Sequence, residues 1–381
     1  MKKTALVGSI LLMTSVASLA QTTVSGNLDI SYKAVNNKKS PIDSYQGFGK
    51  ESQINIANKG KLNNGLDYAA GFSLEFDGND VGNASVGKGW ATENTYIDFI
   101  SGSTTVTFGL DHIQNPDSHA HVNMVGVGYI GGDGIGGAAV AAKTGSSIYP
   151  TGTLSQYQNY GVGIIQSSSI GNFSINFVPT STWSTNQTSG SATMPVSSSN
   201  ISNGGPDIGN SADLTAYEGT GESQYEVGFT GDLGVKGLKV LAFYNKSSAI
   251  DANNGGKNYV GKVLGGSYNF GQFTVGLDYR TQDAAANATT NTEVTGKSVG
   301  VAYAINPNLS VGAVYAKADM SGNSAAAVLA PDTEKTKIIS IGYNMGPVVV
   351  NAQARQTDNV SGNSATNGDA KDGIVKISTK F

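Results

Sequence analysis

The chain of 381 residues contains no cysteine, and this absence excludes several kinds of chemistry at once. Without thiols the protein can form no disulfide, no thiolate nucleophile and no cysteine-ligated zinc or iron–sulfur site. Charged residues are also scarce, at 14% of the sequence, and the only arginines are Arg280 and Arg355. Hydrogen-bonded backbone, rather than covalent cross-links, must therefore supply most of the stability.

Basic residues do not outnumber acidic residues. Of the 24 Lys and Arg, Lys2 and Lys3 fall in an N-terminal segment that resembles an export signal, so 22 remain against 28 Asp and Glu. A nucleic-acid-binding domain is expected to carry a basic patch. The mild negative balance therefore argues against a nucleic-acid partner.

Long hydrophobic runs are almost missing after the first residues. Met1-Lys2-Lys3 precedes an apolar run from Ala5 to Leu19, which ends in the small residues of Ser18-Leu19-Ala20. This pattern predicts a cleaved signal peptide over residues 1–20, with one mature domain over residues 21–381. The stretch Val122–Ala142 is apolar enough for a membrane helix of about 18 residues, but its many glycines disfavour a spanning helix.

The chain is rich in glycine and tyrosine, and apolar and polar residues alternate along many of its segments. Its 51 Gly and 17 Tyr suit strands joined by tight turns. Alternating segments recur from end to end, and the connections between them are by turns short and long. The pattern predicts sixteen strands, at Thr22–Val35, Lys50–Asn58, Leu66–Phe76, Glu93–Ile100, Thr104–Ile113, Gln156–Ser167, Asn172–Pro179, Glu222–Leu233, Leu238–Ser247, Asn258–Phe270, Phe273–Asp283, Glu293–Ile305, Leu309–Met320, Glu334–Met345, Val348–Asp358 and Lys371–Phe381.

The alternation assigns an apolar and a polar face to individual strands. In Phe273–Asp283 the apolar residues share one face, whereas Asp278 and Arg280 share the other. The last strand alternates in the same way and ends on the aromatic Phe381. A strand of this length exposes unpaired backbone groups unless a barrel closes on it. The pattern therefore favours a sixteen-stranded antiparallel transmembrane β-barrel, with a soluble β-sandwich or solenoid as the alternative.

A barrel of sixteen strands is too wide to be filled by side chains from its own wall. Since the inner face is polar, the sequence predicts a water-filled channel. Aromatic residues near the strand ends, such as Tyr32, Tyr268, Tyr303 and Phe381, match the interfacial girdles of such barrels.

The whole chain resembles the general porins of the Gram-negative outer membrane. The similarity rests on the signal, the opening strand Thr22-Thr23-Val24-Ser25-Gly26-Asn27-Leu28-Asp29, the sixteen-segment rhythm and the terminal Phe381. Thr104–Leu110 followed by a long loop is similar to the family's fifth strand and inward-folded third loop, and Gln156–Val162 looks like the strand after it.

This resemblance implies a homotrimer in the outer membrane, in contact with its lipid and lipopolysaccharide, that passes ions and small hydrophilic solutes by passive diffusion. The loop over residues 111–155 would narrow the pore, and Phe381 would be read as a signal by the outer-membrane assembly machinery. A substrate-specific channel and a non-conducting adhesin or structural barrel are the alternatives.

The chain departs from the family in its charges. General porins set acidic groups of the third loop against a cluster of arginines, but only two arginines occur in this chain. Lysines would have to replace part of the cluster. The candidate pore-lining residues are Lys33, Glu75, Asp111, Asp117, Asp133, Lys143, Arg280, Arg355 and Lys376.

Other motifs are weak. His112, His119 and His121 lie with Asp111 and Asp117 in one loop and could ligate a metal, but a solvated loop is the preferred interpretation. Gly126–Gly131 fits a dinucleotide fingerprint without the helix or the acidic residue that should follow. No nucleophile motif accompanies the histidines. The sequence therefore predicts no enzyme activity, no cofactor and no metal site.

Overall fold

The computed structural model describes residues 21–37, 45–77, 91–110, 160–178, 223–247, 259–284, 292–322, 333–359 and 369–381. The predicted signal peptide, the stretch Val122–Ala142 and the three histidines lie outside these residues. Among the residues that are described, no helix has the length and hydropathy needed to span a bilayer.

Sixteen strands account for nearly all of the described residues. They are β1 (Gln21–Asn37), β2 (Tyr45–Lys61), β3 (Asp67–Asp77), β4 (Ala91–Ser101), β5 (Thr104–Leu110), β6 (Tyr160–Ser168), β7 (Gly171–Val178), β8 (Gln224–Gly231), β9 (Leu238–Ser247), β10 (Tyr259–Phe270), β11 (Phe273–Ala284), β12 (Thr292–Asn306), β13 (Leu309–Gly322), β14 (Glu334–Asn344), β15 (Val348–Asp358) and β16 (Ala370–Lys380).

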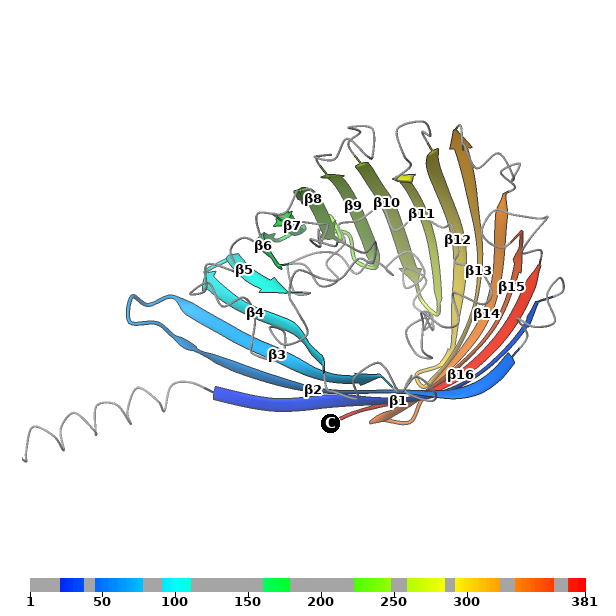
Figure 1. The fold of residues 1–381 in the computed structure, drawn as a ribbon, viewed down its shortest axis with the longest axis horizontal. Helices are drawn as coiled ribbons and strands as arrows, with labels where there is room; N and C mark the ends of the chain where they lie inside the picture. The colour runs from blue at the N-terminus through cyan, green and yellow to red at the C-terminus, as the bar shows by residue number, and fades with distance from the viewer. Residues whose placement is uncertain are drawn as a thin grey trace, which may run out of the picture.

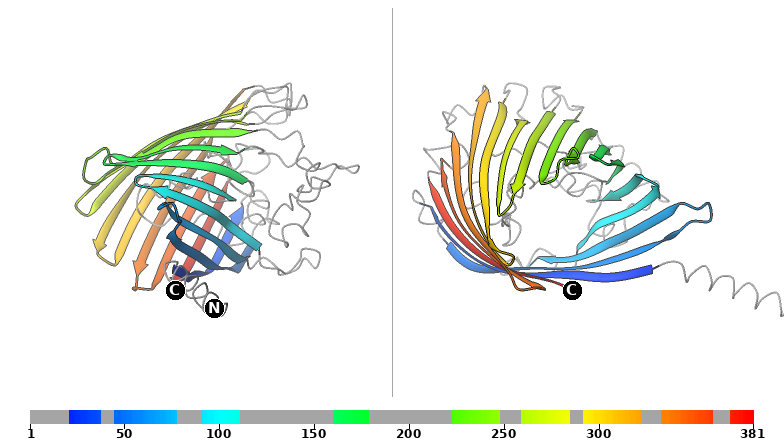
Figure 2. Two further views of the ribbon diagram at one scale, coloured as in Figure 1. Left: turned by 90° about the vertical axis from the view of Figure 1, so that its left-hand side faces the viewer. Right: turned by 180° about the vertical axis from the view of Figure 1, so that it is seen from behind.

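The strands form one closed antiparallel barrel. Each strand pairs with its neighbours in sequence, and β1 completes the ring by pairing with β16, so the strands follow one another around the wall in Figure 1. The side view in Figure 2 shows them crossing the wall obliquely. This architecture confirms the predicted barrel and excludes the sandwich and the solenoid.

The strand bounds follow the alternation closely, with one clear exception. Strands β9 and β15 have the predicted bounds, but β2 begins at Tyr45 rather than at Lys50. Its first residues pair with β1, for example Gly47 with Lys33 and Phe48 with Tyr32. Gly47 and Gly49 obscure the side-chain alternation here, and Gln46 and Phe48 of the extension contact Tyr32 of β1.

The barrel closes at the two ends of the chain. Beyond the paired strands, the Gly26 N–H donates to the Phe381 carbonyl at 2.8 Å, and the Phe381 N–H donates to the Gly26 carbonyl at 3.0 Å. A Cβ at position 26 would lie 2.5 Å from Cζ of Phe381. Glycine therefore lets the terminal ring pack directly on the β1 backbone, and no open edge is left at this seam.

The two faces of the wall differ as the alternation predicts. In β11, Val275, Leu277 and Tyr279 are exposed, whereas Asp278 and Arg280 are buried on the opposite face. Because side chains of a strand alternate between the two faces, the exposed apolar positions lie outside the barrel and the buried polar positions lie inside. The outer surface is therefore apolar, as contact with lipid requires.

Aromatic rings mark both ends of this outer surface. Near the short turns, Tyr268, Phe270, Phe273 and Tyr303 form a continuous band with centroid distances of 6.2, 5.8 and 4.7 Å. Towards the other strand ends, exposed tyrosines recur on β8, β9, β11 and β13. They are Tyr225, Tyr244, Tyr279 and Tyr315. The two bands match the aromatic girdles of outer-membrane barrels.

Candidate channel lining

The inner face of the barrel carries most of its buried polar side chains. They include Asp29, Ser31, Lys33, Ser73, Asp98, Thr107, Ser174, Asn176, Glu226, Asn245, Ser267, Asp278, Arg280, Ser298, Glu334, Ser340, Gln353 and Thr357. Because sixteen strands enclose more space than their own side chains fill, this face borders a lumen.

Five charged side chains meet where β15, β16 and β1 adjoin, and we call them the seam cluster: Asp29, Lys33, Arg355, Asp372 and Lys376. Lys376 Nζ lies 2.6 Å from Oδ2 of Asp29. The Arg355 guanidinium donates through Nε to Oδ2 of Asp372 at 2.6 Å, and its second nitrogen lies equally close. Both ion pairs link neighbouring strands across the wall.

Lys33 is the third cation of the seam cluster. Its side chain is buried, with 6% of its surface exposed, and it interacts electrostatically with Asp372 and Arg355. Within the part of the chain that the structure describes, no carboxylate lies within ion-pair distance of its Nζ. Three cations therefore meet two carboxylates, and the cluster keeps one net positive charge.

The second arginine lies elsewhere on the wall. Arg280 donates through Nε to Asp278 on the same strand, at 2.9 and 3.1 Å, and both side chains are almost fully buried. β11 and β15 are separated by three strands in the ring. The two arginines therefore do not form the arginine cluster that is typical of general porins.

Two other inner carboxylates are bound by neutral side chains. Asp98 accepts a hydrogen bond from the Thr107 hydroxyl at 2.5 Å, which joins β4 to β5. Glu226 accepts one from the Asn176 amide at 3.3 Å, which joins β7 to β8. These contacts give negative charge to the wall between the seam cluster and β9.

An apolar patch interrupts the polar inner face on β9 and β10. Leu241, Phe243 and Val263 pack together with only 4 to 5% of each residue exposed. Phe243 lies opposite Gly228 of β8, and its ring occupies the space that a side chain at position 228 would need. We call these three residues the inner apolar patch. In the ring, β9 lies on the far side from β1.

A family model described as "Gram-negative porin" matches residues 4–362. The chain belongs to the Gram-negative porin family. It is therefore an outer-membrane channel protein, and this membership confirms the predicted family and the prediction that the protein is not an enzyme.

Solved porin structures share the fold of this porin at low sequence identity. An anion-selective porin from Comamonas acidovorans is 14% identical, with a TM-score of 0.61, and the match covers 95% of this chain and 100% of that chain. OmpT of Vibrio cholerae is 11% identical, with a TM-score of 0.58 and coverage of 95% and 98%. A multiply substituted Rh. blastica porin is 15% identical, with a TM-score of 0.57 and coverage of 95% and 100%. No curated protein sequence matches.

The structure brings three of the predicted pore-lining residues of this porin together and separates a fourth. Lys33, Arg355 and Lys376 belong to the seam cluster, whereas Arg280 is bound to Asp278 on β11. Glu75 lies in β3, opposite Gln53 and Ala91. The remaining candidates lie outside the described residues: Asp111, Asp117, Asp133 and Lys143.

Sequence reasoning missed the carboxylates that hold these cations. Asp278 is two residues from Arg280, so the alternation could have paired them. Asp372 and Asp29 could not be found in this way, because their partners lie on neighbouring strands whose register the sequence does not state.

Metal ligands are not grouped in the described part of this porin: no three His, Asp or Glu side chains there could hold one ion. The candidate set around His119 and His121 lies outside that part. The inner carboxylates of Asp29, Asp98, Glu226 and Asp372 are instead engaged by Lys, Thr, Asn and Arg.

Proposed function

We propose that this porin conducts ions and small hydrophilic solutes by passive diffusion. The observation that carries the proposal is a polar inner face inside a closed sixteen-stranded wall whose outer face is apolar. A channel needs a lumen that water can wet, whereas an adhesin needs only its external loops.

Planar-bilayer recording tests this proposal directly. The purified barrel, inserted into a bilayer, should give steps of ohmic conductance, and solute flux should rise in proportion to concentration. Saturating flux would favour the substrate-specific channel. Barrels that insert and stay folded but carry no current would favour an adhesin or a structural role.

The pore-lining roles rest on the inner positions described above. We assign Lys33, Arg355 and Lys376 to the lumen wall and Arg280 to a buried brace of the same wall. Cysteine at position 33 or 376 should react with a water-soluble thiol reagent, because the chain has no competing thiol. Reaction only with lipid-soluble reagents would place the two positions on the outer face.

The loop over residues 111–155 is proposed to fold inwards and narrow the pore. The inner apolar patch supports this proposal, because exposed apolar side chains in a wet lumen are unfavourable unless another segment covers them. The loop contains a glycine-rich apolar stretch and few charges, which suits packing on such a wall. Asp111, Asp117, Asp133 and Lys143 would then face the narrowest part.

Shortening this loop between Ala120 and Ser147 should raise the conductance and admit larger sugars. The control removes the same charges without shortening, with Asp133 replaced by Asn and Lys143 by Gln, and it should leave the size limit unchanged. An unchanged size limit in the shortened barrel would place the constriction elsewhere.

Export by a cleaved signal over residues 1–20 and assembly into a homotrimer complete the proposal. The assembly machinery would read Phe381, which seals the barrel against Gly26. Deleting Phe381 should lower the amount of porin inserted in the outer membrane, measured against the total amount made. Normal insertion with altered conductance would contradict an assembly role.

A further inference from the structure

The short-turn end of the lumen contains a pocket of about 960 Å³ on β9 to β13, which we call the mouth pocket. Small side chains leave this space open, because Ala302 and Ala304 of β12 form part of its lining. The volume is within the roughly 300–1,000 Å³ of sites that hold small ligands. Polar side chains make up much of the remaining lining. They are Lys236, Lys239, Ser267, Asn269, Gln272, Thr274 and Ser310.

Lys239 lines the mouth pocket from β9. It is two residues from Leu241, so the alternation of the strand places it on the inner face together with the inner apolar patch. Its partner in the β9–β10 register is Ser267, which is buried with 5% of its surface exposed. Lys239 itself is exposed. Its ammonium group is therefore available to a solute in the lumen.

A second lysine lines the pocket from the turn between β8 and β9. The Leu238 N–H donates to the Val235 carbonyl at 3.1 Å, which closes the turn around Lys236 and Gly237. Gly237 has a φ of +85°, and a Cβ there would lie 2.6 Å from the Asn269 carbonyl oxygen. The Asn269 N–H donates to the Gly237 carbonyl at 2.8 Å. Glycine therefore lets this turn pack against the end of β10, and the packing places Lys236 beside the pocket.

Neither lysine has a carboxylate at ion-pair distance within the described part of the chain. The ion pairs found there include neither Lys236 nor Lys239. The described lining of the pocket contains no Asp or Glu. Asp232 belongs to the same turn as Lys236, but its Oδ1 accepts a hydrogen bond from the Gly234 N–H at 2.9 Å. The mouth pocket therefore presents two cations to a solute.

Other polar groups of the mouth pocket can donate and accept hydrogen bonds. Asn269 is opposite Thr274, and its amide donates to the Thr274 hydroxyl oxygen at 2.9 Å. This contact leaves the hydroxyl proton of Thr274 to donate. Ser267 lies diagonally across from Thr274 on the same strand pair. Side chains at diagonal positions are about 7–8 Å apart, so one sugar ring can reach both hydroxyls.

We infer that the mouth pocket binds a phosphorylated sugar. The phosphate lies against Lys236 and Lys239, and the sugar hydroxyls form hydrogen bonds with Ser267, Asn269 and Thr274. Short turns face the periplasm in outer-membrane barrels, so the site is at the periplasmic end of the lumen. The inference rests on the proposed function, because the sugar has to enter a wet lumen. It adds a solute class and a site away from the seam cluster.

Phosphorus-31 nuclear magnetic resonance of the detergent-solubilised porin tests the site, with glucose 6-phosphate as the probe. Titration of the porin against the probe signal gives the dissociation constant. The double variant Lys236→Gln/Lys239→Gln should bind about tenfold more weakly than the wild type, because each exposed ion pair changes an affinity by up to about fivefold. Lys236→Arg/Lys239→Arg keeps both charges and should bind like the wild type.

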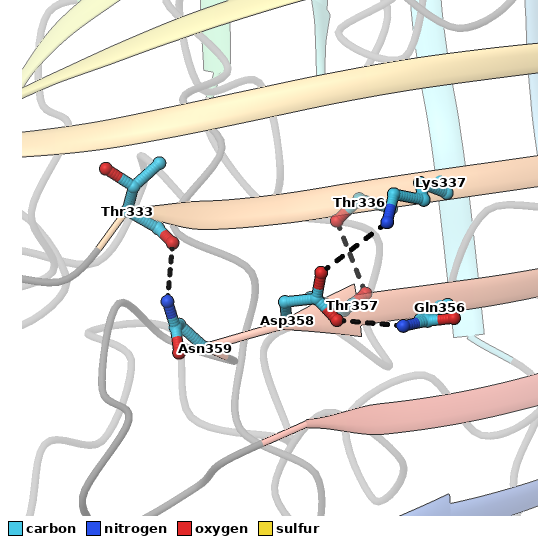
Figure 3. A network of polar contacts seen from close by, with 7 residues as sticks. All are labelled: Thr333, Thr336, Lys337, Gln356, Thr357, Asp358 and Asn359. Carbon is cyan, nitrogen blue, oxygen red and sulfur yellow. Dashed lines mark hydrogen bonds and ion pairs between the residues drawn. The ribbon is translucent and has the colours of Figure 1, made fainter.

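The matched control removes two lysines that have carboxylate partners. In Lys61→Gln/Lys337→Gln the lost contacts are those with Asp67 at 2.7 Å and with Asp358 at 3.8 Å, and Figure 3 shows the second pair. The net charge changes by the same amount as in the first double variant. Binding of glucose 6-phosphate should equal that of the wild type, since neither lysine lines the mouth pocket.

The variant Ala304→Phe tests the space in the pocket. Ala304 is exposed, so the larger ring takes up room that the sugar needs without disturbing a buried position. Binding of glucose 6-phosphate should be lost although both lysines remain. Migration of the unheated barrel on a gel checks that each variant is folded.

Three results would overturn the inference. The first is equal binding of glucose 6-phosphate by the wild type and by folded Lys236→Gln/Lys239→Gln. The second is displacement of the probe by inorganic phosphate at equal concentration, which would indicate a simple anion site. The third is the same displacement by glucose, which would make the lysines irrelevant. Binding is measured without current, so a barrel that conducts but does not bind contradicts only this inference, and absence of current contradicts only the proposed function.

Discussion

Two parts of the inner wall face each other with opposite chemistry. At β15, β16 and β1, five charged side chains form two ion pairs and leave one lysine over, whereas on β9 and β10 Leu241, Phe243 and Val263 form an apolar patch. Both parts follow the same strand geometry, in which every second side chain points inwards. What differs is the environment that each part needs.

The charged part can border water, because two of its cations are held by carboxylates and its net charge can be solvated. The apolar part cannot, because a bare hydrocarbon surface in a wet lumen is unfavourable. If the loop over residues 111–155 folds inwards as proposed, the lumen has one wall that borders water and one wall that is covered. Solutes would then pass along the seam cluster, whose charge should set the ion preference.

The largest effect is expected on the covered wall. Phe243→Ala should lower the free energy of unfolding by about 3–5 kcal/mol, because it leaves a cavity under whatever covers the patch. Denaturant titration of the folded barrel measures this change. The control is Tyr244→Ala on the exposed outer face, and equal losses in the two variants would show that the patch is not covered.

A smaller effect is expected on the charged wall. Asp29→Asn combined with Asp372→Asn removes both carboxylates of the seam cluster and leaves its three cations, so the reversal potential in a salt gradient should move towards anions. We expect the ratio of anion to cation permeability to change about tenfold, because a permeating ion interacts with these charges where water is restricted. Asp67→Asn at the exposed Lys61–Asp67 pair should leave the ratio unchanged. A similar shift of the reversal potential in both variants would show that the seam cluster has no special role in ion selectivity.

The smallest effect is expected from the third cation alone. Lys33→Gln removes one positive charge without breaking an ion pair, so selectivity should move towards cations by about threefold. The barrel should keep its stability. Lys33→Arg, which keeps the charge, should behave like the wild type, and a shift in that variant would point to packing rather than charge.

Much of this arrangement follows from short-range sequence patterns. The alternation of β11 places Asp278 and Arg280 on one face, and the structure pairs them there. The same pattern gave correct bounds for β9 and β15. The alternation did not predict the inner apolar patch. Apart from Lys239, the segment Leu238–Tyr244 is apolar on both faces, so polar and apolar residues do not alternate in it.

The seam cluster consists of contacts that a short-range sequence pattern cannot predict. Arg355 and Asp372 are on different strands and become neighbours only through the β15–β16 register. Lys376 reaches Asp29 only because the last strand pairs with the first. On the outer face, Lys297, Lys317 and Lys335 likewise stand opposite one another only through the registers of β12, β13 and β14.

The sequence by itself determined the number of strands, their order, and which face of most strands is polar. These properties depend on a period of two residues and on the short turns, which are local. The tertiary structure decided which charges pair, where the apolar patch lies inside, and which lysines stand side by side outside. Register and closure join residues far apart in the chain, and a shift of one residue would have moved every side chain to the other face.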